Sequence, residues 1–101
     1  MDTDELSREA YKAVIIEAGK FTHDLALQFG VLASDCDDEN EFLQKSRELI
    51  EEMKTLARED LEDMFFGVMP DIAHLNVALD KIIANIEKVQ RMPISKRKYG
   101  F

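Results

Sequence analysis

The chain has 101 residues, a length typical of a single domain with one hydrophobic core. Its 13 basic and 21 acidic residues give a net charge of −8, which argues against general nucleic-acid binding by the domain. The one cysteine excludes an internal disulfide, and no apolar run approaches the roughly 18 residues of a membrane span. Because the start, MDTDELSRE, also lacks the features of a signal peptide, we expect a cytoplasmic protein without membrane contact.

Apolar residues recur at three- and four-residue steps along most of the chain, which predicts helices and no strands. The first predicted helix covers residues 4–29, with a capping signal at Asp2 and Glu5 and with Gly30 as the residue that ends it. Gly19 lies in its middle and costs roughly 1 kcal/mol of helix stability relative to Ala. This glycine fits either a close helix crossing or a slight bend.

The second predicted helix covers residues 38–66. Asp38 and Glu41 have the spacing of a capping box, and Gly67 is the residue expected to end the helix in the left-handed conformation.

The third predicted helix covers residues 70–91, with Pro70 in its first turn and Met92-Pro93 as its stop signal. The remaining segment, residues 93–101, is basic and has no apolar period. We expect it to be a flexible C-terminal tail that the domain does not require for folding.

Short connections between long amphipathic helices predict an all-α domain over residues 1–92, arranged as an up-down-up three-helix bundle. Self-association would complete this bundle into a larger one. The predicted core residues are Phe21, Leu25, Leu49, Ile50, Met53, Leu56, Leu79, Ile82 and Ile86.

Charge is segregated along the chain. Residues 1–34 carry six acids and three bases, residues 35–63 carry twelve acids and four bases, and residues 64–101 carry three acids and six bases. The acidic second helix is either a solvated face or a docking face for a basic partner.

Three acids in the link before the second helix, Asp35, Asp37 and Glu39, alternate like the first ligands of a calcium loop. The pattern then fails, because Asn40 stands where the loop needs glycine and Ser46 where it needs the bidentate glutamate. We therefore expect no calcium site.

Two pairs of glutamates, Glu48 with Glu51 and Glu59 with Glu62, resemble the paired carboxylates that hold magnesium in helical NTP pyrophosphatases. Those sites need carboxylates from facing helices, whereas both pairs here lie on one predicted helix. We therefore expect no metal centre and no cofactor.

The two histidines do not form the pattern of a metal centre. Asp71 and His74 have the spacing of a carboxylate–histidine metal pair, but His23 has Lys20 where a second such pair would need an acid, which disfavours a di-iron centre.

The segment Ala73-His74-Leu75 resembles the helix of histidine phosphotransfer domains. Those domains follow the histidine with a basic residue and a glycine, whereas this chain has Val77 and Ala78. The resemblance covers three residues.

The first and third predicted helices carry more apolar residues than a three-helix bundle needs to bury. We expect these additional residues to form an interface with another molecule. They are Ile16, His23, Leu27 and Val31 on the first helix, and Ala73, Val77 and Ala84 on the third.

The leading hypothesis is a non-enzymatic helical protein–protein interaction module that forms a homodimer or binds a protein partner through the first and third helices. The alternative is a small acidic regulator, antitoxin-like or immunity-like, whose second helix masks a basic partner. A histidine phosphotransfer protein or metal-dependent helical enzyme is the third hypothesis. The sequence shows no evident small-molecule substrate.

Overall fold

A computed structural model describes residues 1–100, which contain helices and no strand. The prediction of an all-α fold is confirmed, but the three predicted helices are divided into five. The first runs without interruption over residues 8–21 and consists of α1, a π-helical segment and α2. Their bounds are Arg8–Tyr11, Lys12–Ile16 and Glu17–Phe21, followed by α3 at His23–Ser34, α4 at Glu39–Thr55, α5 at Arg58–Met64 and α6 at Ile72–Arg91.

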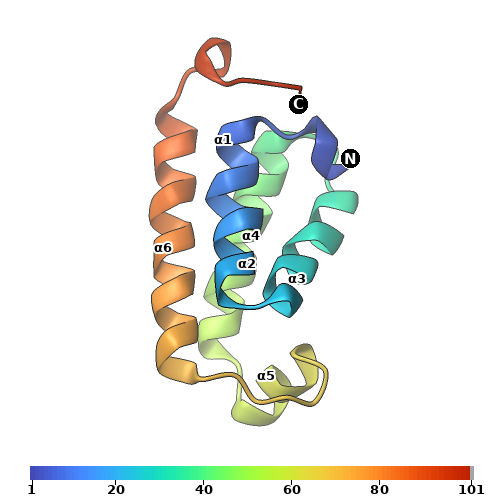
Figure 1. Cartoon of the computed structure of the whole chain (residues 1–101), viewed down its shortest axis with the longest axis vertical. Coiled ribbons are helices and arrows are strands. Elements are labelled where there is room, and N and C mark those ends of the chain that lie inside the picture. The colour runs from blue at the N-terminus through green and yellow to red at the C-terminus, as the bar shows by residue number, and fades with distance from the viewer. Residues whose placement is uncertain (101) are drawn as a thin grey trace.

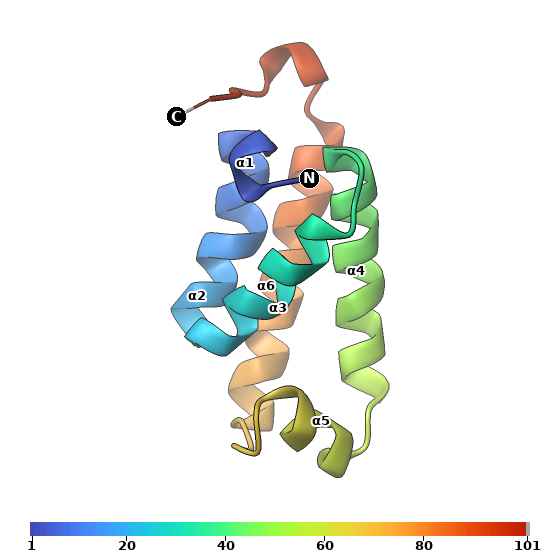
Figure 2. The same ribbon diagram turned by 90° about the vertical axis from the view of Figure 1, so that its right-hand side faces the viewer.

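The arrangement is a bundle with one oblique helix. The helix of residues 8–21, α4 and α6 follow the long axis of the molecule, and α3 packs obliquely against α2 and α4 (Figures 1 and 2). The short helix α5 lies at one end, where the chain passes from α4 to α6 (Figure 2). The position of a fourth long helix is thus occupied by α3, a segment that the sequence assigned largely to the first helix.

The predicted helix over residues 4–29 is interrupted at Thr22. This residue is extended, with φ −151° and ψ 156°, and its Oγ1 accepts a hydrogen bond of 3.1 Å from the backbone N–H of Leu25. Thr22 therefore caps α3, and the chain folds back so that α3 lies beside α2. A Cβ at Gly19 would lie 3.8 Å from Ala26 Cβ, which favours the close helix crossing over the slight bend.

Both ends of that first predicted helix are also displaced. The α-helix begins at Arg8 after Ser7, whose Oγ accepts from the N–H of Ala10, and not at residue 4. Gly30 lies inside α3 and ends nothing, because the helix continues to Ser34. The glycine signal was misleading since a glycine in a packed helix needs no left-handed backbone.

The second predicted helix, residues 38–66, is divided where Leu56 adopts an extended conformation between α4 and α5. Its start is confirmed, because the Asp38 side chain accepts a hydrogen bond of 2.8 Å from the N–H of Glu41. Burial of the Leu61 side chain stabilises the fold with this break, because the short helix α5 then packs over the end of the core.

The end of α5 has an unusual residue in its left-handed position. Phe66 has φ 57°, and the N–H of Gly67 donates to the carbonyl of Glu62 at 2.8 Å, the pattern of a Schellman motif. Gly67 has φ 84°, so the predicted left-handed glycine is present. The left-handed conformation begins one residue earlier than predicted, at Phe66, at a cost of roughly 1–2 kcal/mol relative to glycine.

The third predicted helix begins two residues later than expected. Asp71 caps α6 by accepting a hydrogen bond of 3.1 Å from the N–H of His74, and Pro70 lies outside the helix. The end at Arg91 before Met92 agrees with the prediction.

The predicted core is largely confirmed. Phe21, Leu49 and Leu56 are partly buried and pack against the core, and the other six predicted residues are buried. Leu6, Phe29 and Phe42 are fully buried as well, so residues of α3 and of the segment before α1 contribute to the same core.

Replacement of Thr22 by Ala should lower the free energy of unfolding by about 1 kcal/mol, because α3 loses the side chain that satisfies its first turn. Urea unfolding followed by circular dichroism measures this change. Thr22→Ser is the matched control and should remain close to wild type. Equal stability of the Ala variant would show that the cap does not determine the break.

Candidate functional site

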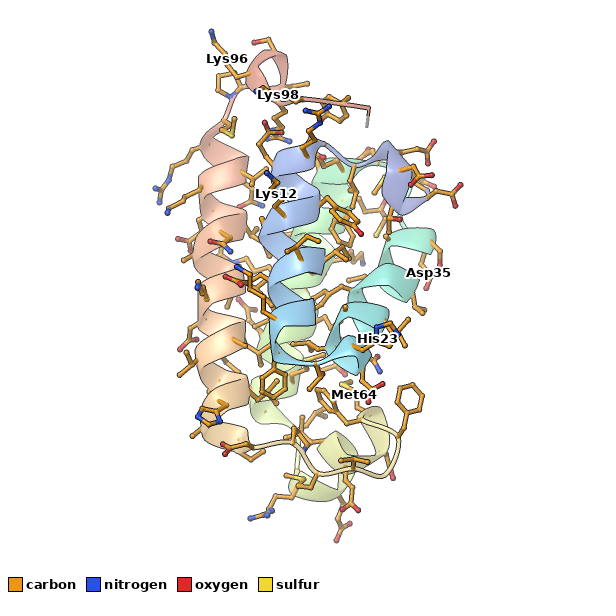
Figure 3. The ribbon with its side chains drawn as sticks, viewed as in Figure 1. Lys12, His23, Asp35, Met64, Lys96 and Lys98 are labelled. Carbon is orange, nitrogen blue, oxygen red and sulfur yellow. The ribbon has the colours of Figure 1, made fainter. Side chains whose placement is uncertain are left out.

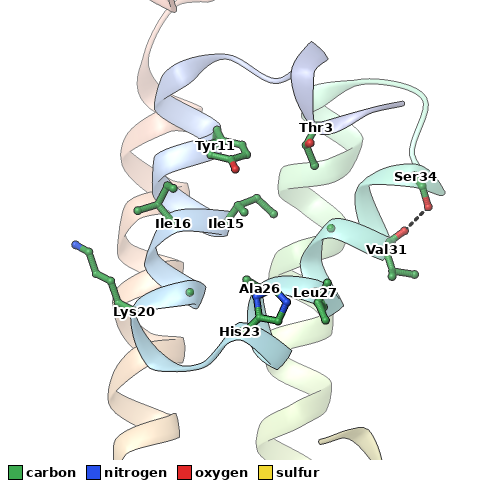
Figure 4. A pocket seen from close by; sticks show the side chains of 12 residues that line it. Thr3, Tyr11, Ile15, Ile16, Lys20, His23, Ala26, Leu27, Val31 and Ser34 are labelled. Atoms are coloured by element: carbon green, nitrogen blue, oxygen red, sulfur yellow. Dashed lines mark hydrogen bonds between the residues drawn. The ribbon is translucent and has the colours of Figure 1, made fainter. Parts of the chain in front are cut away.

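A hollow on the surface lies between the helix of residues 8–21 and α3. This α2–α3 groove has a volume of about 780 Å³ and is lined mainly by apolar side chains (Figure 4). One wall comes from residues 8–21 and the other from α3. The lining includes Tyr11, Ile15, Ile16, Gly19, Lys20, His23, Ala26, Leu27, Gly30 and Val31.

Small residues form the groove where the two helices approach. Gly19 and Ala26 lie close together near the turn at Thr22, so α2 and α3 are near neighbours there. A Cβ added to Gly30 would meet no heavy atom within 4 Å, and the backbone of this glycine therefore faces open space. The break at Thr22 and the small side chains beyond it together make the hollow.

Four residues predicted for an interface, Ile16, His23, Leu27 and Val31, line this groove. The sequence placed them on one face of a continuous helix, whereas the structure places Ile16 on the first helix and the others on α3, across the hollow (Figure 4). The three aliphatic side chains remain 43%, 44% and 64% exposed, in chain order.

The predicted interface residues of α6 lie elsewhere. Ala73, Val77 and Ala84 are exposed, and none of them lines the α2–α3 groove. Val77 contributes to a smaller hollow of about 220 Å³ beside Phe21 and Lys81. The structure therefore does not bring the two predicted sets together at one groove.

A second groove runs on the other side of α2, between the helix of residues 8–21 and α6. This α2–α6 groove has a volume of about 540 Å³. Ile16 and Lys20 line both grooves, so these two residues form the ridge between them. The other apolar residues of the second groove are Ala13, Val89 and Met92, and its other basic residues are Lys12 and Lys88.

The acids beside the α2–α6 groove are already paired. Glu17 is buried, with its carboxylate 3.4 Å from Lys20 Nζ and 3.3 Å from Lys81 Nζ. Burial alone would raise the pKa of Glu17, but hydrogen bonds from the two lysines outweigh it and lower the pKa. The Glu9 carboxylate accepts a hydrogen bond of 2.9 Å from the N–H of Lys98, which lowers the pKa of Glu9. Lys12 and Lys88 form no ion pair within residues 1–100 and leave this groove positive.

The acidic residues gather on α4 and α5. Glu48 and Glu51 belong to α4, whereas Glu59 and Glu62 belong to α5, so the two pairs lie on separate helices and not on one as predicted. All four are exposed. Within the described residues no group of three histidine, cysteine or acidic side chains is placed to hold a metal ion.

The α5 loop, residues 65–71, displays two apolar side chains. Phe66 and Val68 are each 68% exposed. Phe65 turns inward instead, where its ring packs edge-on against Phe21 with 6.5 Å between the ring centroids.

His74 has no place in either groove. Its side chain is exposed, and Nδ1 lies 3.4 Å from a carboxylate oxygen of Asp71 that also caps α6. The carboxylate–histidine pair thus serves the helix end. The alternating acids of the predicted calcium-like pattern separate as well, because Asp35 and Asp37 are exposed and Glu39 turns inward.

Glu39 is the centre of a buried polar cluster that the sequence analysis missed. Its carboxylate is 7% exposed and accepts three hydrogen bonds. The donors are the N–H of Ser7 at 2.5 Å, Arg97 Nη1 at 2.7 Å and the Tyr99 hydroxyl at 2.8 Å. Burial by itself raises the pKa of Glu39, but these hydrogen bonds more than offset it, and the pKa lies below its usual range.

The same cluster holds the C-terminal segment, which the sequence led us to expect as a flexible, dispensable tail. Arg97 is buried and also donates to the carbonyl of Met92, and the N–H of Arg8 donates to the carbonyl of Lys98 at 2.8 Å. Residues 93–100 therefore lie across the start of α1 (Figure 1). Phe101 lies outside the described residues.

No local sequence signal could have found this cluster. Glu39 and Arg97 are 58 residues apart, and each lies in a stretch of like charge where exposure is the ordinary outcome.

Comparison of the chain with protein-family models, with curated proteins and with solved structures gave no match. Within the described residues, no helix has the length and apolar character needed to cross a membrane.

Acidification should destabilise the protein through Glu39. The folded state favours the ionised carboxylate, so this stabilisation is complete above the ordinary pKa of 4.5 and is lost as the pH falls through the lower folded value. Urea unfolding between pH 7 and pH 3 should show a falling free energy of unfolding. Glu39→Gln should reduce this pH dependence, and the part that is left should come from Glu9 and Glu17, whose pKa values are also lowered. At pH 7 the variant should be less stable by about 3 kcal/mol, since Arg97 keeps a buried charge without its partner. An unchanged pH profile in Glu39→Gln would contradict this role.

Proposed function

We propose that this chain is a non-enzymatic helical protein–protein interaction module. Its binding face consists of the helix of residues 8–21 with α3 on one side and α6 on the other. The observation that supports the proposal is the exposed ridge at Ile16, which has an apolar groove on each side.

The shape of the face favours a protein segment as the occupant. The α3 wall covers about twelve residues, or roughly 18 Å of helix, which matches about three turns of a bound helix. Full burial of an exposed aliphatic side chain gains roughly 1.5–3 kcal/mol. Ile16, Leu27 and Val31 thus provide a drive to associate that isolated exposed side chains would not.

A second copy of the chain is the partner that the charge distribution favours. The α2–α6 groove is positive around Lys12 and Lys88, whereas residues 35–63, which include α4 and most of α5, carry twelve of the 21 acids. One molecule therefore presents both members of a complementary pair of surfaces, and association with a copy brings them together.

A specific observation also favours the acidic regulator as a second candidate function. Glu59, Asp60, Glu62 and Asp63 on α5 are exposed and form no ion pair with any other described residue. Such a cluster leaves negative potential for a basic partner. Charge reversal on α5 would abolish binding of that partner, whereas Ile16→Glu would leave it intact.

Association through the proposed face should be lost when charge enters it. At micromolar concentration, sedimentation velocity should show a larger species for wild type and monomers for Ile16→Glu, because the carboxylate would be desolvated in the interface. Leu27→Glu tests the α2–α3 groove alone, and it should weaken association if that groove takes part in the interface. Ile94→Glu is the matched control, since Ile94 is an exposed aliphatic residue outside both grooves. A monomeric wild type, or oligomers in all three variants, would refute self-association through this face.

Gly30 allows the α2–α3 groove to be filled without damage to the fold. Gly30→Leu places a side chain in open space and replaces a helical glycine, so the free energy of unfolding should rise by up to about 1 kcal/mol. If the groove holds the partner, association should weaken by about tenfold or more. Gly30→Ala is the control, because it should raise the free energy of unfolding in the same way while its single methyl group leaves most of the groove open. Undiminished association of a folded Gly30→Leu variant would remove this groove from the interface.

A further inference from the structure

The α5 loop pairs an exposed aromatic side chain with an unfavourable backbone. Phe66 has φ 57° and Gly67 after it has φ 84°, and the Phe66 and Val68 side chains are both exposed. Burial of Leu61 and Phe65 accounts for the turn, but it does not account for a large apolar side chain at the exposed left-handed position, and such a side chain is available for contact with another molecule.

The surroundings of this loop are strongly acidic. Residues 58–71 contain five acids and one base, a net charge of −4. The α5 loop therefore exposes two apolar side chains next to a cluster of acidic residues.

The α2–α6 groove has the opposite character. Its apolar lining consists of Ala13, Ile16, Val89 and Met92. The lining also contains three lysines, Lys12, Lys20 and Lys88, against the two acids Glu9 and Glu17, a net charge of +1. Glu17 is further neutralised by Lys81 from outside the groove. A volume of about 540 Å³ is well above what one aromatic side chain occupies.

The α5 loop does not fill the α2–α6 groove of its own molecule, because none of residues 65–71 lines that groove and both Phe66 and Val68 stay exposed. Lys12, in the groove, lies far along the long axis from Met64 of α5 (Figure 3). Symmetric pairing of the α2–α6 groove with itself would place lysines opposite lysines, which is unfavourable. A contact between the groove and the α5 loop must therefore join two copies.

We propose that copies of this chain associate head to tail, with the α5 loop of one copy seated in the α2–α6 groove of the next. Phe66 and Val68 contact Val89 and the side of the ridge at Ile16, and the acids of α5 face Lys12 and Lys88. This inference rests on the proposed self-association and specifies its geometry. Because the two contacting surfaces differ, each copy keeps one free surface of each kind, and oligomer size increases with concentration.

The decisive experiment mixes two complementary variants. Phe66→Gly removes the aromatic ring and leaves the groove intact, and it should unfold at a higher urea concentration than wild type because glycine suits the left-handed position. Lys12→Glu with Lys88→Glu reverses the groove and leaves the loop intact. Lys45→Glu with Lys96→Glu is the control of equal charge change, since both lysines are exposed and lie outside the groove.

In sedimentation velocity, each complementary variant alone should be monomeric, with affinity at least about tenfold weaker than wild type, and their equimolar mixture should form a 1:1 heterodimer. The control variant should assemble like wild type. Rising salt between 50 and 500 mM should weaken wild-type assembly, because the contact pairs opposite charges.

The possible failures are distinguishable. If wild type associates and Ile16→Glu abolishes association, but the mixed variants stay monomeric or Phe66→Gly assembles like wild type, then the head-to-tail geometry is wrong and the interaction face stands. A monomeric wild type at hundreds of micromolar refutes both. Should the lysine double variant fail to fold, Lys88→Glu alone is mixed with Phe66→Gly, and the same outcomes apply.

Discussion

The hydrogen bond from the N–H of Leu25 to the Thr22 side chain fixes the turn on which the rest of the architecture depends. Without an extended residue at this point, residues 8–34 would continue as one long helix and the fourth side of the bundle would be open. With it, α3 returns along α2, and Gly19 and Ala26 let the two backbones approach. The same turn that completes the core therefore also creates the α2–α3 groove.

The opposite end of the bundle is closed by electrostatics. Glu39 accepts hydrogen bonds from the segment before α1 and from the C-terminal segment, so one carboxylate links three stretches of chain that are distant in sequence. Burial of the charge is tolerated because Arg97 neutralises it and Ser7 and Tyr99 satisfy its remaining lone pairs. The basic C-terminal segment is therefore part of the fold, because Arg97 and Tyr99 both bind Glu39.

Charge and apolar surface are separated in a way that a monomer does not need. Buried Glu17 forms ion pairs with Lys20 and Lys81, yet the α2–α6 groove remains positive. The largest concentration of acids lies in residues 35–63. Exposed aliphatic residues line the α2–α3 groove, and an aromatic residue with a left-handed backbone lies at the acidic end. This polarity is the common basis of the proposed interaction module and of its head-to-tail geometry.

The all-α class, most of the core, the helix starts at Asp38 and near Asp71, and the excess of apolar surface could be predicted from the residues alone, because each depends on local capping or on residues a few positions apart. The sequence did not determine the break at Thr22, the inward turn of Glu39 or the left-handed Phe66. In each case the local conformation is not the one that the nearby residues favour, and a contact with a distant segment stabilises it. The break at Thr22 allows α3 to pack on the core, the inward Glu39 forms the ion pair with Arg97, and the turn at Phe66 allows Leu61 and Phe65 to be buried. Only the tertiary structure decides such choices, since the energies that settle them come from contacts between segments far apart in the chain.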